Sequence, residues 1–195
     1  MVTLFITKCY VDDNNNEDVV VKVSKVFTTI IIDNLRCIKY MSDICLQKEL
    51  MFYNDHIPQM SIKEYCQRIV GLTHCEEGSF IASLLYIDRV CKYNNVILTL
   101  NNIHKLLFTS IIISIKYNED QCYMDDYYAK VGGVSLLEYI QLQCEFLQLI
   151  KYNLYINEEE YETYKRCFIG VHYYYRTQPN HNNNNNNQLN CYMLI

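Results

Sequence analysis

The run LLFTSIIISI at residues 106–115 is the longest apolar run of the chain. With the polar start at residues 101–102, it predicts a helix from about Thr99 to Tyr117. The run is apolar nearly all round, so the helix is expected to be buried on most sides, in the middle of the other helices. A buried strand at residues 111–113 is the alternative, because periodicity alone does not separate the two.

Two helices are expected before this run. Ser61-x-x-Glu64 is a capping box, which predicts a helix that begins there and continues to about His74. Glu76 and Glu77 suit the beginning of a second helix, because acidic residues are favourable at the N-terminal end of a helix dipole. The apolar stripe of this second helix repeats at helical spacing, at Phe80, Leu84, Ile87 and Cys91.

Two more helices are expected after the run. Residues 126–131 form a short segment that stops at the glycine pair 132–133, a natural helix end. A second capping box at residues 135–138 predicts a helix to about Lys151. The residues expected to point inward from that helix are Leu136, Ile140, Cys144, Leu147 and Ile150. The segments between residues 61 and 151 therefore predict five core helices.

The outer segments complete the predicted organisation. Residues 1–24 are expected to form a mobile N-terminal arm, and residues 25–57 an N-terminal helix that flanks the domain. The core domain and a last helix with an acidic start are expected over residues 58–175. Residues 176–195 include an asparagine tract at 182–187, which is typical of a disordered tail.

The composition indicates a helical domain without a metal site. Few turns can be built from 5 glycines and 2 prolines, which favours long helices. The 10 cysteines are scattered, with no C-x-x-C pair, so they are expected to be reduced thiols in a protein of the cytoplasm or nucleus. No cofactor is expected. The net charge of −5 argues against a nucleic-acid partner, and the lack of an apolar run of ~20 residues argues against a membrane.

No pattern of catalytic residues stands out. The 5 histidines are isolated, and nothing resembles G-x-S-x-G or a local signature of a catalytic cysteine. The glycine pair 132–133 lacks the Lys-Ser/Thr of a phosphate-binding loop, so it is interpreted as a helix end and turn. The chain is therefore not expected to be an enzyme.

Three phrases in the central part of the chain resemble the cyclin box. They are LLYIDR at residues 84–89, NNIHKLLFTS at 101–110 and YAKVGG at 128–133. The third phrase is typical of the P/U-type branch, which is related to the PHO-type cyclins of fungi. The resemblance covers about residues 58–164. It implies an all-α, five-helix cyclin-box domain with a single box and one flanking helix on each side.

The resemblance implies a regulatory subunit that binds and activates a cyclin-dependent protein kinase. By matching positions, the kinase-facing surface would consist of Ile113, Lys116, Tyr117, Gln143, Leu147, Tyr152 and Leu154. The alternative is a non-catalytic cyclin-box adaptor that binds a non-kinase protein through the same face. Two departures leave this alternative open. The docking phrase Met-Arg-Ala-Ile-Leu of mitotic cyclins is absent, and Gln143 stands where cyclins have a glutamate that pairs with the lysine.

Asp88 is expected to have a structural role. The resemblance implies that this carboxylate, in the Tyr-Ile-Asp-Arg phrase, braces the first core helix through an arginine, and Arg68 is the only arginine on that helix. A partly buried carboxylate needs such a partner. From the residues alone, an ordinary surface ion pair is the alternative. Lys116, for its part, also suits the C-terminal end of a helix dipole.

Overall fold

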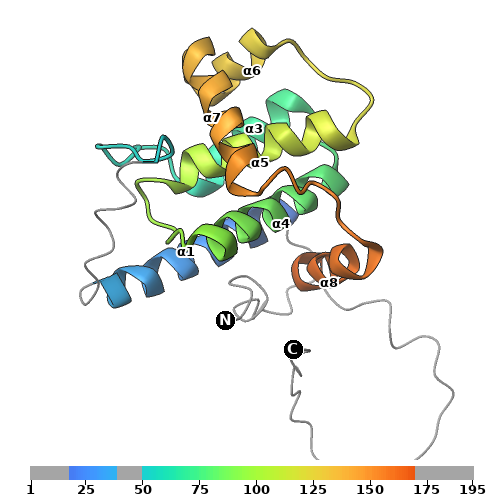
Figure 1. The fold of residues 1–195 in the computed structure, drawn as a ribbon. Helices are drawn as coiled ribbons and strands as arrows, with labels where there is room; N and C mark the ends of the chain where they lie inside the picture. Colours follow the sequence, from blue (N-terminus) through green and yellow to red (C-terminus); the bar gives the residue numbers. More distant parts are fainter. Residues whose placement is uncertain (1–17, 39–49, 170–195) are drawn as a thin grey trace, which may run out of the picture.

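The computed structural model describes residues 18–38 and 50–169, and all the regular structure in these ranges is α-helical. Figure 1 shows the helices in chain order. They are α1 (Val19–Ile38), α3 (Ile62–Thr73), α4 (Glu77–Asn94), α5 (Ile103–Asn118), α6 (Asp125–Gly132), α7 (Leu136–Leu149) and α8 (Glu158–Ile169). The predicted all-α class is confirmed, with α3 to α7 as the five core helices and α1 and α8 beside them.

Helix α5 lies in the middle of the domain, where it packs against α3, α4, α6 and α7. Every residue from 106 to 115 is at most 4% exposed, so the apolar run is a buried helix and the strand alternative is wrong. Its serines do not leave unpaired hydroxyls in the core. The Ser114 hydroxyl donates to the Ser79 carbonyl of α4 at 2.7 Å, and the Ser110 hydroxyl donates to the Leu107 carbonyl at 2.9 Å.

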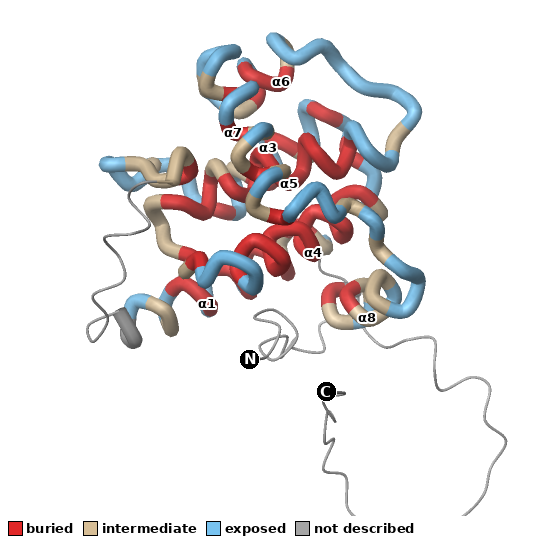
Figure 2. The backbone as a smooth tube through the Cα atoms, in the orientation of Figure 1, coloured by how far each residue is buried: buried red, intermediate tan, exposed pale blue. Residues whose placement is uncertain are grey.

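Helix α4 is buried more completely than its apolar stripe predicts. The stripe residues are buried as expected, and so is every other residue from Ser79 to Cys91. The reason is that α4 is covered on different sides by α5, α7 and α8. Figure 2 shows α4 and α5 as the two almost continuously buried helices of the domain.

The predicted helix ends are observed. The Ser61 hydroxyl accepts the Glu64 N–H at 3.2 Å while the Glu64 carboxylate accepts the Ser61 N–H at 3.0 Å, which is a complete capping box. Ser135 caps α7 in the same way, by accepting the Glu138 N–H at 3.1 Å. The Glu138 carboxylate, however, pairs with Lys105 at 2.9 Å.

The glycine pair ends α6 for two different reasons. Gly133 has a φ of 73°, in the left-handed region that residues with a side chain rarely adopt. Gly132 is needed for close packing, because a Cβ atom at this position would lie 2.4 Å from the Phe108 ring of α5. The pair is therefore a helix end that also lets α6 approach the central helix.

The N-terminal boundary is a correction to the sequence analysis. Helix α1 begins at Val19, so residues 19–24 belong to the helix and not to a mobile arm over 1–24. The Asp18 carboxylate accepts the Val20 N–H at 2.9 Å, and the side chains of Val20 and Val23 are buried. Valine has a low intrinsic helix propensity, and burial against the neighbouring helices outweighs it here.

The flanking segment predicted over 25–57 is a single helix only up to Ile38 among the described residues. Residues 50–60 form turns and bends instead. They still pack on the domain, since Phe52 is fully buried and its ring lies 5.9 Å from that of Phe146 in α7. Residues 1–17, 39–49 and 170–195 lie outside the described residues, and with them the asparagine tract and the end of the last predicted helix.

Candidate partner-binding surface

Helix α7 carries apolar residues on two sides. Its core side consists of Tyr139, Leu142 and Phe146, which are fully buried. The stripe predicted to point inward lies mostly at the surface: Leu136 and Ile140 are each 44% exposed, and Cys144 is exposed. Within that predicted stripe, Leu147 is half-buried and Ile150 is buried. The prediction was wrong because the larger aromatic side chains give the greater gain on burial, so they occupy the core.

Lys116 connects three helices at one end of this surface. Its ammonium group donates to the Gln143 side-chain carbonyl of α7 at 3.0 Å and to the Asp125 carboxylate of α6 at 2.5 Å. It also lies 5.2 Å from the centre of the Tyr139 ring. The hydrogen bond from Lys116 holds the pKa of the Asp125 carboxyl below its usual value. The negative charge that is absent at position 143 is therefore supplied by Asp125.

Sequence reasoning missed Asp125. Its only signal was an acidic residue in the first turn of a short helix, which the helix dipole already explains. Nothing in its spacing from Lys116 indicated that the loop before α6 would return the chain to the end of α5. This contact is decided by the tertiary fold.

The other predicted residues divide between the surface and the core. Tyr117 and Tyr152 are 52% and 66% exposed. Leu154 is half-buried and lines a hollow together with Tyr117. The Tyr152 N–H donates to the Leu147 carbonyl at 2.8 Å, which joins this segment to α7. Ile113 is different, because only 4% of it is exposed; it belongs to the core and is withdrawn from the predicted surface.

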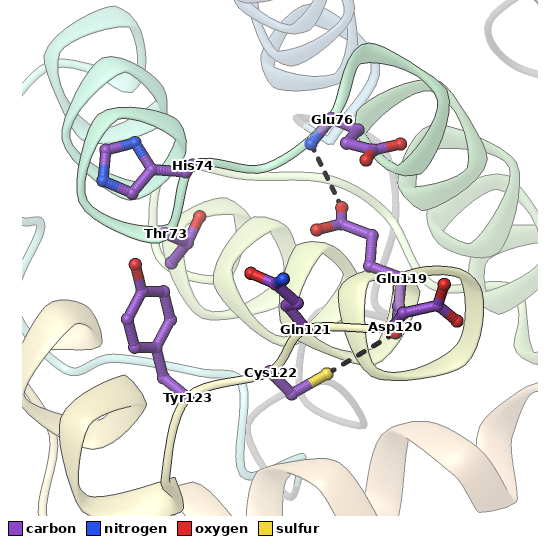
Figure 3. A pocket seen from close by; sticks show the side chains of 8 residues that line it. All are labelled: Thr73, His74, Glu76, Glu119, Asp120, Gln121, Cys122 and Tyr123. Atoms are coloured by element: carbon purple, nitrogen blue, oxygen red, sulfur yellow. Dashed lines mark hydrogen bonds between the residues drawn. The ribbon is translucent and has the colours of Figure 1, made fainter.

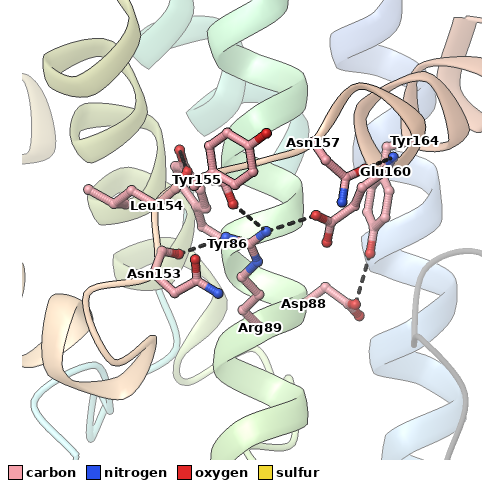
Figure 4. A network of polar contacts seen from close by, with 9 residues as sticks. All are labelled: Tyr86, Asp88, Arg89, Asn153, Leu154, Tyr155, Asn157, Glu160 and Tyr164. Carbon is pink, nitrogen blue, oxygen red and sulfur yellow. Dashed lines mark hydrogen bonds and ion pairs between the residues drawn. The ribbon is translucent and has the colours of Figure 1, made fainter.

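The segment after α7 is held in place by two side chains of α4 (Figure 4). Three consecutive carbonyls of this segment accept hydrogen bonds from them. Arg89 donates to Asn153 at 2.6 Å and to Tyr155 at 2.9 Å, and the Tyr86 hydroxyl donates to Leu154 at 2.9 Å. This clamp positions Leu154 and its neighbours at the surface, although the segment has no regular structure of its own.

Arg89 is a buried arginine whose charge is balanced. It is 7% exposed, and its guanidinium group forms an ion pair with Glu160 of α8 at 2.9 Å. The same group therefore ties the segment after α7 and the beginning of α8 to α4. The sequence analysis noted Arg89 only as part of a phrase, because a contact with carbonyls far along the chain leaves no local pattern.

Asp88 is buried as expected, but its predicted partner is wrong. The side chain is 4% exposed and its carboxylate accepts the Tyr164 hydroxyl of α8 at 2.8 Å. Burial, together with the nearby Asp88 charge, raises the pKa of Tyr164. Arg68 lies elsewhere, at the surface, where it donates to the Val131 carbonyl at 3.2 Å. Arg68 therefore ties α3 to the end of α6, because the buried side of α3 carries Cys66 and Ile69.

The described residues offer no alternative site of another kind. They include no group of three or more His, Cys, Asp or Glu side chains that would hold a metal ion. None of the described helices is both long and apolar enough to cross a bilayer. A central helix wrapped by four others, with an apolar surface beside its end, is instead typical of a domain that binds another protein.

Comparison with known proteins identifies this domain. The sequence profile of the Cyclin family matches residues 40–154, and the chain belongs to the cyclin family. It is 34% identical to Cyclin-U2-1 of Arabidopsis thaliana over 157 residues, which are 80% of this chain and 70% of that protein. The predicted resemblance to a cyclin box is confirmed.

Two further relatives define the branch. Cyclin-P3-1 of Oryza sativa subsp. japonica is 30% identical over 114 residues, 58% of this chain and 48% of that protein. PHO85 cyclin-7 of Saccharomyces cerevisiae is 31% identical over 134 residues, 63% of this chain and 47% of that protein. The chain thus spans about half the length of these two relatives. The similarity to U-type, P-type and PHO85 cyclins confirms the predicted P/U-type character.

Proposed function

We propose that this chain binds a cyclin-dependent protein kinase and raises its activity by helping to place the kinase's activating helix. The observation that carries the proposal is the apolar side of α7 that no other part of the described chain covers. An interface core of apolar and aromatic residues with a polar rim is typical of specific protein complexes. Membership of the cyclin family supports a kinase as the partner.

The proposed surface has a defined layout. Its apolar part is the outer side of α7, with Leu136, Ile140 and Leu147, and the exposed Tyr117 and Tyr152 extend it. Its polar part is the contact of Lys116 with Gln143 and Asp125. The kinase would contribute all the catalytic groups, and this chain none.

The proposal includes the compartment. We place the chain in the cytoplasm or nucleus, where protein kinases of this class act on other proteins. The six cysteines in the described ranges, Cys66, Cys75, Cys91, Cys122, Cys144 and Cys167, are all free thiols, which suits a reducing compartment. Burial raises the pKa of Cys66 to about 12, so this thiol is unreactive.

Co-purification of a kinase with the tagged chain, followed by a binding titration, tests the function. Ile140→Asp places a charge in the centre of the proposed contact and is expected to weaken kinase binding at least about tenfold. Leu72→Asp on α3 is the matched control, since Leu72 is 43% exposed and Ile140 44%. Equal binding by the two variants would contradict the proposed surface. Retention of another protein and no kinase would instead indicate the cyclin-box adaptor.

A further inference from the structure

A groove of about 440 Å³ lies beside the partner surface, between α4, α5, α8 and the segment after α7. Its residues from α4 include the small Gly78, Ser79 and Ala82. Its other sides carry aromatic residues, with Tyr117 from α5 and Tyr155 from the segment after α7. These two tyrosines are 52% and 70% exposed, so their rings are accessible to a ligand.

A second hollow of about 510 Å³ adjoins the first, and Glu76 lines both. Figure 3 shows its residues, which lie between the end of α3 and the loop after α5. They are Thr73, His74, Glu76, Glu119, Asp120, Gln121, Cys122 and Tyr123. The two hollows together provide more length than a single side chain needs, and each volume lies in the range of ~300–1,000 Å³ found for ligand sites.

The charge of this double groove has one sign. Four carboxylates line it, from Glu76, Glu119, Asp120 and Glu158, and no lysine or arginine lines either hollow in the part of the chain that the structure describes. The Glu119 carboxylate accepts the Glu76 backbone N–H at 3.1 Å, a contact that leaves its charge uncompensated. A groove that combines exposed tyrosine rings with unneutralised carboxylates attracts cations and repels acidic or phosphorylated ligands.

We propose that the double groove binds a basic, extended peptide segment of a protein that the kinase complex recruits. Lysine or arginine side chains would pair with the carboxylates and lie over the tyrosine rings, and apolar residues between them would fill the space above Gly78 and Ala82. No residue of α7 lines either hollow, so the groove adjoins the proposed kinase surface only at Tyr117 and Leu154. Recruitment to a kinase complex rests on the proposed function, whereas binding of the peptide does not.

The binding test uses the full chain and two fluorescent peptides. One is acetyl-Lys-Leu-Arg-Ile-Lys-Val-amide, and the other has glutamate in place of each basic residue. Fluorescence anisotropy should show binding of the basic peptide and at least about tenfold weaker binding of the acidic one. The same affinity for both peptides, or no affinity for the basic one, would overturn the proposal.

A pair of double variants locates the site. Glu76→Gln with Glu158→Gln should weaken binding of the basic peptide roughly tenfold, because each exposed charge contact contributes about 0.2–1 kcal/mol and a factor of ten corresponds to about 1.4. Asp55→Asn with Asp126→Asn changes the net charge equally, and Asp126, like Glu158, lies in the first turn of a helix. This control should change the affinity less than about twofold. An equal loss in both double variants would mean that only the overall charge attracts the peptide.

The partner kinase separates this proposal from the proposed function. Saturating kinase should leave the peptide affinity within about twofold, since the groove lies mostly outside the proposed contact with α7. Displacement of the peptide by the kinase would show that the groove belongs to the kinase interface and would overturn the proposal. Self-association of the chain that the Glu76→Gln/Glu158→Gln variant abolishes would do the same in favour of a second copy. Peptide binding by a chain that binds no kinase would contradict only the proposed function.

Discussion

Helices α5 and α7 have similar apolar content and opposite environments. In α5 every residue from 106 to 115 is buried, and its neighbours cover it on all sides. In α7 the aromatic side faces the core while Leu136 and Ile140 face solvent. Because both helices are apolar on more than one side, the pattern alone does not tell a side that the domain covers from one that a partner covers.

The comparison has a simple cause. The centre of a five-helix domain has room for only one helix that is covered all round, and α5 occupies it. Helix α7 packs at the periphery, so at most one of its sides reaches the core. A second apolar side on a peripheral helix is therefore better evidence for a binding surface than an apolar side on a central helix.

The largest expected difference comes from the same substitution in the two helices. Ile112→Ala in α5 removes a fully buried side chain and leaves a cavity, so the free energy of unfolding should fall by about 3–4 kcal/mol. Ile140→Ala in α7 should change it by less than about 0.5 kcal/mol, since this side chain is already 44% exposed. Urea denaturation of both variants measures this. Similar losses would mean that the exposed side of α7 contributes to the core.

The Arg89 clamp should have the next largest effect. Arg89→Met leaves the carbonyls of Asn153 and Tyr155 and the carboxylate of Glu160 without this partner, and we expect a loss of about 2–3 kcal/mol. Kinase affinity should fall as well, because the segment that carries Leu154 loses its position. Lys92→Met on the exposed side of α4 is the control and should cost less than about 0.5 kcal/mol. Unchanged stability of Arg89→Met would show that the clamp is not needed.

The buried contact between α8 and α4 should have an intermediate effect. Tyr164→Phe removes the hydroxyl that donates to the Asp88 carboxylate, at a cost of about 1–2 kcal/mol. Tyr93→Phe is the matched control, since Tyr93 is 39% exposed, and it should be nearly neutral. Thermal or urea denaturation compares the two. A neutral Tyr164→Phe would mean that other contacts of Asp88 satisfy its charge.

The smallest effect is expected at Lys116. The folded-state pKa of Asp125 lies below the usual 3.8, so this carboxylate stabilises the fold above that pH, and its contribution is lost as the pH falls through the lowered pKa. Asp125→Asn should therefore reduce stability at pH 6 by less than about 1 kcal/mol, since water screens an exposed pair. The difference from the parent should disappear in acid. A difference that persists at pH 2 would have a cause other than this charge.

Gln143→Glu tests the same contact by adding a charge. A glutamate at 143 would give Lys116 a second carboxylate beside Asp125, and kinase affinity should stay unchanged or increase. A binding titration against the co-purified kinase measures this, with Leu72→Asp again as the reference for an unrelated surface change. A clear loss of affinity would indicate that the kinase needs a neutral group at this position.

Much of the fold could be predicted because its signals are local. The capping residues Ser61 and Ser135, the acidic start of α4 and the glycine pair after α6 all act within one helix turn of their own position. The buried run of α5 is equally explicit, since no other arrangement covers ten consecutive core residues. Prediction failed at Val19–Ser24, where low helix propensity gave way to burial.

The amino-acid sequence by itself determined the all-α class, the order of the helices and the cyclin family of this chain. Only the tertiary structure decided which side of α7 is covered, which carboxylate Lys116 meets, and that Arg89 holds the segment after α7 while Arg68 holds the end of α6. The physical reason is range. Caps and helical periods depend on neighbours a few residues away, whereas these contacts join residues up to 66 positions apart through the packing of whole helices.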